Sequence, residues 1–112
     1  MQTLIHLISE DETEHETALA VAENLLADES GSIDDVAVVA QSKGIEAVTA
    51  GGKHEEQVQS LINDGVSFKG CSNTLEMMDL DESDLVDGVE TVPEGAVEVT
   101  KLENEGYAYL RP

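Results

Sequence analysis

The chain has 112 residues, and 25 Asp and Glu residues against 5 Lys and Arg give it a formal net charge of −20 at pH 7. This length is typical of one domain, and the charge disfavours nucleic acids and anionic membranes as direct partners, because contacts to phosphate need clustered Lys and Arg. No apolar run approaches the roughly 18 residues of a membrane span. No basic leader precedes the first apolar run, so we expect a cytoplasmic protein.

The first half of the chain alternates between apolar runs typical of strands and amphipathic segments typical of helices. In the first predicted helix, Leu19, Ala22 and Leu26 recur on one face, and Ser9–Asp11 supply candidate cap residues before it. Gly65 stands where a left-handed residue commonly ends a helix. The expected elements are a strand at 3–8, a helix at 12–28, a strand at 33–40, a short helical turn within 43–52 and a helix at 54–64.

The second half continues the alternation with shorter elements. The acidic segment DLDESDLVDG reads as a loop with one helical turn, and Pro93 suits the first turn of a helix. The expected elements are a strand at 66–70, a short helix after Cys71, a strand at 89–92, a helix from Pro93 to Gly106 and a strand at 107–110. Strands and helices in alternation with short connections predict an α/β domain, with a mainly parallel sheet covered on both faces.

The acidic residues are spread along the chain and do not form a tail. They run from Glu10 to Glu105 among regularly spaced apolar residues, which favours a folded domain with an acidic surface over a disordered segment. Such a surface repels itself at low salt, and about 1 M salt shortens the Debye length to about 3 Å. We therefore interpret the charge as adaptation to a high-salt cytoplasm. A partner-specific acidic surface is the alternative.

Cys71 is the only cysteine, which excludes an intramolecular disulfide and fits a reducing compartment. It lies at the carboxyl end of a predicted strand, where reactive groups gather in parallel sheets. The following segment predicts a helix with Asn73 as its cap and Glu76 at the third position. Backbone N–H groups at that helix start would lower the thiol pKa, as would Lys69 on the same face of the strand. The alternative is that Cys71 is a buried small apolar residue.

Three histidines are the other candidates for chemistry. His6, in the first predicted strand, is interpreted as a packed or interface residue, and we expect His15 and His54 to be solvated on acidic helix surfaces. No two of the three have metal-ligand spacing on one helix. The acidic loop starting at Asp79 lacks the glycine that a calcium loop needs at its sharp turn. We therefore expect no metal site and no organic cofactor.

Several segments, in order, resemble the DsrE/DsrF-like family of small α/β proteins. They are the first strand ending at Ser9 with its SEDE turn, the helix AVAENLLAD with Asn24, the stretch GVSFKGCSNTLE with Cys71, and the closing EGYAYLRP. The resemblance covers the chain essentially from end to end. It implies one domain over residues 1–112, a three-layer αβα sandwich with a mainly parallel sheet of about five strands.

The resemblance also implies a function. The best understood members of the family carry persulfides in sulfur-relay pathways, and Cys71 matches the cysteine that accepts a sulfane sulfur. This implies a sulfurtransferase-like carrier with Cys71 as the carrier residue, Lys69 as its charge neighbour, and Ser72, Asn73 and Thr74 acting through backbone N–H groups. The expected partners are a sulfurtransferase donor, a sulfur-acceptor protein and further copies of the chain in a trimer or hexamer.

A second interpretation belongs to a different class of function. In it, the protein is a non-catalytic oligomeric scaffold or small-molecule-binding module of the same fold, and Cys71 is inert. Redox sensing through oxidation of Cys71 is a third possibility, although the sequence supplies no second cysteine to resolve a sulfenic acid.

Overall fold

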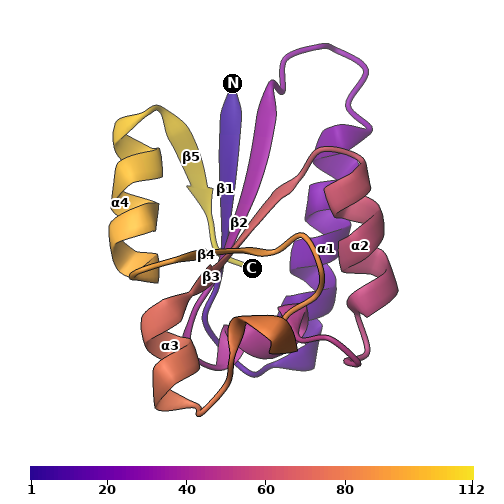
Figure 1. Ribbon diagram of the computed structural model, residues 1–112. Coiled ribbons are helices and arrows are strands. Elements are labelled where there is room, and N and C mark those ends of the chain that lie inside the picture. Colours follow the sequence, from indigo (N-terminus) through magenta and orange to yellow (C-terminus); the bar gives the residue numbers. More distant parts are fainter.

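A computed structural model describes residues 1–112, and it contains the alternating elements that the sequence predicts (Figure 1). The boundaries differ from the predictions mostly by one or two residues, and the loop before β4 holds the expected helical turn. The elements are β1 (Gln2–Leu7), α1 (Glu12–Leu26), β2 (Asp35–Ala40), the 3-10 helix η1 (Ser42–Val48), α2 (Glu55–Asn63), β3 (Ser67–Cys71), α3 (Ser72–Met77), the 3-10 turn η2 (Glu82–Asp84), β4 (Glu90–Val92), α4 (Gly95–Asn104) and β5 (Tyr107–Leu110).

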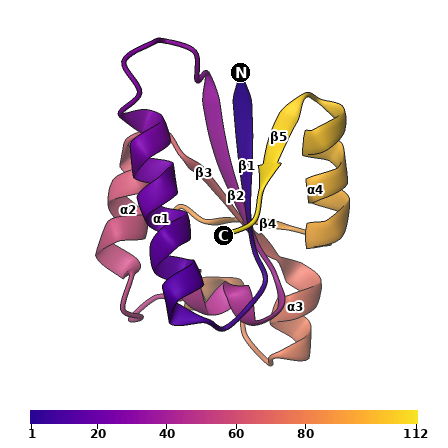
Figure 2. The same ribbon diagram turned by 180° about the vertical axis from the view of Figure 1, so that it is seen from behind.

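The five strands form one parallel sheet in the order β4-β3-β2-β1-β5. The chain moves outward from β1 to β4 and then returns through α4 to place β5 on the other side of β1. Because crossovers between parallel strands are right-handed, a reversal of direction puts the connecting helix on the opposite face. Accordingly, α1 and α2 cover one face and α4 the other, while α3 and η1 lie at the carboxyl ends of the strands (Figures 1 and 2). This confirms the predicted α/β class and its parallel sheet.

Two apolar cores lie on the two faces of the sheet. The larger one holds 19 buried residues, among them Leu19, Val58 and Phe68, and fills the space between the sheet and helices α1 and α2. The smaller one holds five buried residues, among them Leu4, Val99 and Leu102, and lies under α4. Because strands β1 and β2 contribute to both cores, their near-continuous apolar sequences are those of strands buried on both faces. No helix has the length and apolar character needed to cross a membrane.

Two of the residues predicted at helix ends have the predicted role, and two do not. Asp11 caps α1 by accepting from the backbone N–H of Thr13 at 2.8 Å, and Gly65 follows α2 with a φ of +107°. The predicted cap at Asn73 is wrong, because β3 extends to Cys71 and α3 begins at once, which makes Cys71 the cap residue. Pro93 likewise precedes the cap of α4 and lies outside its first turn, since Glu94 is the cap.

The C-terminal strand is held to the sheet by a side chain as well as by its backbone. Tyr107 donates its hydroxyl hydrogen to the carboxylate of Asp35 at the start of β2, across β1. This hydrogen bond, together with burial, raises the pKa of Tyr107 to about 12. The rest of β5 is exposed, and its outer edge is unpaired.

Candidate functional site

Cys71 ends the strand β3 and is completely buried, with 0% of its surface exposed. Its side chain points to the face of the sheet that α4 covers. The thiol Sγ lies 3.6 Å from Oε1 of Glu94, which is within range of an S–H donor and a carboxylate acceptor. Glu94 is the cap residue that precedes α4, and the same Oε1 accepts from the backbone N–H of Ala96 at 3.5 Å. The polar neighbour of the thiol is therefore a carboxylate that can accept its proton.

Lys69 shares the α4 face of β3 with Cys71 but makes a different contact. Its Nζ lies 2.7 Å from Oε2 of Glu98, and both side chains are largely buried. Cys71 contacts Glu94 and Lys69 contacts Glu98, and these two glutamates are one turn apart at the start of α4. The prediction that Lys69 and Cys71 share one face of the strand is therefore correct. The ammonium group is, however, already paired with a carboxylate. It is not free to stabilise a negative sulfur as the sequence analysis expected.

The backbone donors predicted for the thiolate are also partly engaged. The N–H of Asn73 donates to the carbonyl of Pro93 at 3.3 Å, and this contact ties the start of α3 to the segment before α4. Helix α3 has only six residues, so its dipole is that of fewer than two turns. Ser72 is the first residue of this helix. The environment of Cys71 is therefore set by Glu94 more than by the helix that follows the cysteine.

A cavity of about 370 Å³ opens at the carboxyl ends of β2 and β3, next to the cysteine. Asn73 and Thr74, two of the predicted supporting residues, line it, whereas Lys69 and Ser72 do not. Glu94 lines the cavity and also contacts Cys71, whereas Cys71 itself is not part of the lining. The complete lining consists of Gln41, Ser42, Lys43, Asn73, Thr74, Met77, Met78 and Glu94.

One wall of this cavity has an unusual backbone conformation. Ser42 has a φ of +52°, a left-handed conformation that few residues other than glycine adopt. Its N–H donates to Thr74 Oγ1 at 2.9 Å, which joins the end of β2 to α3. Strained residues of this kind persist only where the surrounding structure holds them in place, and they cluster at binding and catalytic sites.

A hydrogen-bonded chain runs from the cavity to the surface through His6. Nε2 of His6 lies 2.7 Å from Gln41 Oε1, and Nδ1 lies 2.6 Å from the hydroxyl oxygen of Tyr109. The imidazole therefore donates from Nε2 to the amide and accepts at Nδ1 from the tyrosine. Burial lowers the pKa of His6, although the hydrogen bond to Gln41 acts in the opposite direction. The prediction of a packed histidine is confirmed, since 7% of His6 is exposed.

Sequence reasoning missed six of the eight residues that line this cavity, among them Gln41, Ser42 and Glu94. Gln41 and Ser42 follow the end of β2, and Glu94 comes two residues after the end of β4. The rule that pointed to Cys71, that reactive groups gather at the carboxyl ends of parallel strands, applies equally to these two strands. Applied to every strand, it would have found all three.

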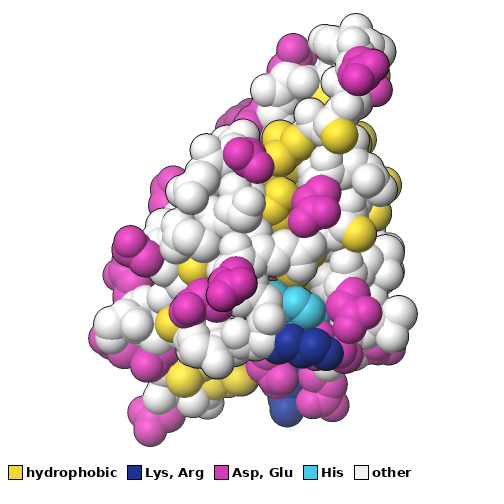
Figure 3. Space-filling view, turned by 90° about the vertical axis from the view of Figure 1, so that its right-hand side faces the viewer, with side chains coloured by type: hydrophobic (Ala, Val, Ile, Leu, Met, Phe, Trp, Pro, Cys, Tyr) yellow, Lys and Arg dark blue, Asp and Glu magenta, His cyan; other side chains and the backbone are white.

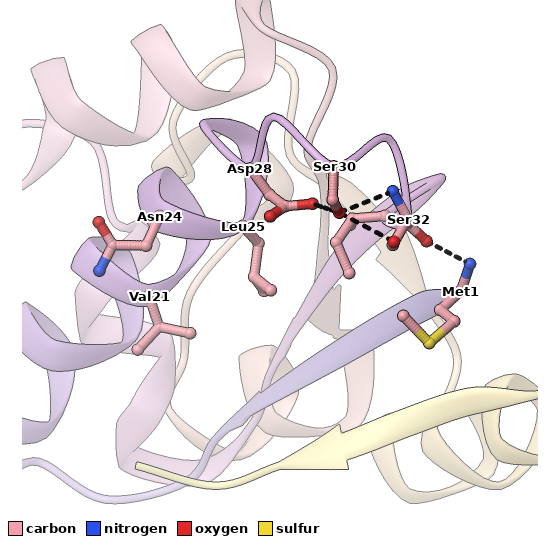
Figure 4. Close-up of a pocket in the computed structure, with 8 residues that line it drawn as sticks. Met1, Val21, Asn24, Leu25, Asp28, Ser30 and Ser32 are labelled. Carbon is pink, nitrogen blue, oxygen red and sulfur yellow. Dashed lines mark hydrogen bonds between the residues drawn. The ribbon is translucent and has the colours of Figure 1, made fainter.

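A second hollow, of about 420 Å³, lies at the opposite end of the sheet (Figure 4). Val21, Asn24 and Leu25 of α1 form one side of it, and Met1 and the loop before β2 form the other. Ser30 in this loop hydrogen-bonds to Asp28 and Ser32, and the amino group of Met1 donates to the Ser32 carbonyl at 2.6 Å. These contacts are internal to the loop and the N-terminus. This hollow lies at the amino ends of the strands, whereas Cys71 lies at the carboxyl end of β3. Asn24, one of the residues that carry the family resemblance, is therefore distant from Cys71.

The prediction that His15 and His54 are solvated is wrong. Only 2% of His15 and 9% of His54 is exposed, because the start of α1 packs against the start of α2. His54 Nε2 is hydrogen-bonded to Glu12 Oε1, and this bond lowers the pKa of Glu12. The error arose because the pattern along each helix shows an acidic surface but not the second helix that covers it.

The DsrE/DsrF-like family model matches residues 2–112. Among solved structures, "Protein of Unknown Function MTH1491" from Methanobacterium thermoautotrophicum is 32% identical to this chain, with a TM-score of 0.93 over 99% of this chain and 98% of the other. "Conserved Protein of Unknown Function BT1422" from Bacteroides thetaiotaomicron is 12% identical, with a TM-score of 0.76 over 97% and 92%. The second likeness concerns the fold alone. A comparison with curated proteins gave no match.

Proposed function

Because this chain belongs to the DsrE/DsrF-like family, we propose that it carries sulfane sulfur as a persulfide on Cys71, in a sulfur-relay pathway of a reducing cytoplasm. The contact between the Cys71 thiol and the Glu94 carboxylate, at the wall of a cavity, is the observation that supports this proposal most strongly. Sulfur transfer requires a thiolate that attacks. A carboxylate beside the thiol can take the proton as the attack occurs.

The transfer step balances without an outside oxidant. The sulfur of Cys71 attacks the terminal sulfur of a donor persulfide, R–S–SH, while the thiol proton moves to Glu94. The new Sγ–S bond forms as the donor S–S bond breaks, and the departing donor thiolate then takes this proton from Glu94. The products are the Cys71 persulfide and the donor thiol R–SH, with no net oxidation.

Access to the sulfur is the second requirement for transfer, and it depends on the position of the Glu94 side chain. Cys71 is fully buried, and Glu94 is the residue that both contacts its thiol and lines the cavity. Rotation of this one side chain, whose capping bond to Ala96 is long at 3.5 Å, would open a path from the cavity to the sulfur. Asn73, Thr74 and the strained Ser42 would then line the approach of the donor or acceptor sulfur.

Treatment of the intact protein with inorganic polysulfide tests this function. We expect mass spectrometry to find an added mass of about 32 Da on Cys71, and we expect Cys71→Ser to lose it while circular dichroism shows an unchanged fold. Glu94→Gln, which keeps the shape of the side chain but cannot accept the proton, should slow loading by about 100-fold or more. The matched control Glu103→Gln, an exposed substitution on the same helix, should load at the wild-type rate.

The complete burial of Cys71 favours one other function, a small-molecule-binding module or scaffold with an inert cysteine. The two functions give opposite results in a single alkylation experiment. A carrier has a native thiol that reacts with iodoacetamide and with polysulfide. Reaction only after denaturation, with no sulfur adduct on the native protein, would contradict the carrier function and leave the cavity as a binding site.

We expect the protein to assemble into a homo-oligomer, a trimer or a hexamer. The outer edge of β5 is unpaired, and four apolar side chains on α3, α4 and β5 are exposed: Met77, Val97, Tyr109 and Leu110. Such edges and apolar patches are usually covered by another chain or segment. Light scattering at high salt should give three or six times the 12.0 kDa mass of one chain. A single species of 12.0 kDa would contradict this expectation.

A further inference from the structure

Two buried histidines and a glutamate meet where α1 and α2 begin, on the face of the sheet opposite α4. Glu12, His15 and His54 each offer one potential metal-ligating atom, and these three atoms lie within 4.8 Å of one another. The two imidazoles are almost inaccessible, whereas the Glu12 side chain is 48% exposed. The cluster is separate from the Cys71 site, and the carrier function leaves it without a role.

We propose that Glu12, His15 and His54 bind a divalent transition-metal ion, Zn²⁺ by the nature of the ligands. Two imidazole nitrogens and one carboxylate oxygen form a three-residue ligand set found at zinc sites that keep a fourth position for water or a small ligand. Ligands of a tetrahedral Zn²⁺ lie about 3.4 Å apart, given bonds of about 2.1 Å. The three atoms lie within 4.8 Å of one another, so rotation of the exposed Glu12 side chain, with a small shift of the imidazoles, would bring them to this spacing.

The three ligands come from two helices whose starts are fixed. Glu12 and His15 are three residues apart in the first turn of α1 and so share one face of that helix, while the Asp11 cap fixes where the helix begins. His54 immediately precedes α2, and the two helices pack against each other. The ion would thus join segments about 40 residues apart in sequence, and this separation explains why spacing along one helix did not reveal the site.

A hydrogen bond outside the cluster orients one of the ligands. His15 Nε2 lies 2.7 Å from the carbonyl oxygen of Ser9, which can only accept, so Nε2 carries the proton. In the neutral imidazole, this leaves Nδ1 with the lone pair that metal binding requires. Metal-binding histidines commonly donate their other N–H to a backbone carbonyl in this way. The hydrogen bond between Glu12 and His54 engages one imidazole, and the second lies edge-on to it with ring centroids 6.3 Å apart.

The charge around the cluster is also suited to a cation. Lys53 Nζ lies 3.6 Å from Glu12 and 3.7 Å from Glu16, so an exposed lysine partly balances this acidic group. Histidine and basic side chains lie side by side among acidic ones on the face that α1 and α2 cover (Figure 3). A bound Zn²⁺ would take the place of Lys53 beside Glu12. It would tie the start of α1 to the start of α2.

Zinc titration of the chelator-stripped protein tests this site, with Cys71→Ser as the parent so that the thiol cannot contribute. Concentrated potassium nitrate is the suitable salt, because chloride itself binds Zn²⁺. Competition with a chromophoric chelator should give one Zn²⁺ per chain, and zinc should raise the thermal midpoint. The Co²⁺ form should show visible d–d bands without a thiolate charge-transfer band.

Three substitutions separate this site from general binding of zinc to the acidic surface. His54→Gln and Glu12→Gln should each weaken zinc binding by about 100-fold or more and remove the thermal shift, since each removes a direct ligand. Glu56→Gln, an exposed acid outside the cluster, should leave the affinity unchanged. Because Glu12 is exposed, Glu12→Gln should fold even if the histidine variant does not. Equal zinc affinity in Glu12→Gln and the parent, or no stoichiometric binding in the parent, would overturn the proposal.

Discussion

Raising KCl from about 0.1 M to multimolar concentration should raise the thermal midpoint of this protein by about 10 °C or more. The cause is the net charge of −20 on 112 residues. In five ion pairs, the cationic partner is more than half exposed. These pairs are Met1–Asp34, Lys43–Glu10, Lys53–Glu12, Lys53–Glu16 and Arg111–Glu14. Exposed pairs of this kind contribute little stability, so most of the repulsion between the acids is uncompensated. Shortening the Debye length from about 10 Å to 3 Å or less screens that repulsion.

Salt also strengthens burial of apolar surface, so a charge variant is needed to isolate the screening effect. A fourfold variant, with Glu29, Glu56, Glu103 and Glu105 all replaced by Gln, removes exposed acids that form no side-chain hydrogen bond or ion pair. Its thermal midpoint, followed by circular dichroism, should be higher than that of the wild type at low salt and should rise less with KCl. A wild-type midpoint that does not change with salt would refute the interpretation of the charge. Identical salt dependence in the two proteins would do the same.

Gly44→Ala should destabilise the domain by about 4 kcal/mol or more, which is much of the total stability of an ordinary domain. An added Cβ at Gly44 would lie 2.3 Å from the carbonyl oxygen of Leu7 and 2.7 Å from the backbone nitrogen of Ile8. Leu7 is the last residue of β1 and pairs with Ala40 of β2, so this backbone cannot move without breaking the sheet. Gly44 therefore lets η1, and with it Ser42 and Lys43 of the cavity, pack directly on the end of β1.

Gly51→Ala is the matched control for this substitution. Gly51 has a φ of +78°, but nothing lies within 4 Å of an added Cβ, so its cost is the conformational strain of about 1–2 kcal/mol alone. Urea unfolding of both variants in the same high-salt buffer compares the stability lost to the steric clash at Gly44 with the stability lost to backbone strain at Gly51. A Gly44→Ala protein as stable as Gly51→Ala would show that β1 and η1 can separate without loss of the fold.

Much of the fold could be read from the sequence because its signals are local. Apolar runs such as TLIHLI need burial on both faces, and acidic segments with apolar residues every three or four positions need one buried face. These requirements predicted the five strands, four main helices and parallel sheet that the structure contains. They also placed Cys71 at a strand end and Lys69 on its face, since side chains alternate along a strand.

Only the tertiary structure decided which groups surround those residues. Lys69 is close to Cys71 in the chain and was therefore predicted to interact with the thiol. Helix α4 instead brings Glu98 to Lys69 and Glu94 to Cys71 from more than 20 residues away. The cap at Asn73 failed for a related reason, since pairing of Cys71 with Val92 extends β3 up to the first residue of α3. The pattern along each helix predicts solvated positions for His15 and His54, whereas packing of α1 on α2 buries both. Local periodicity determines which face of an element must be covered, but it carries no information about which distant side chain covers it.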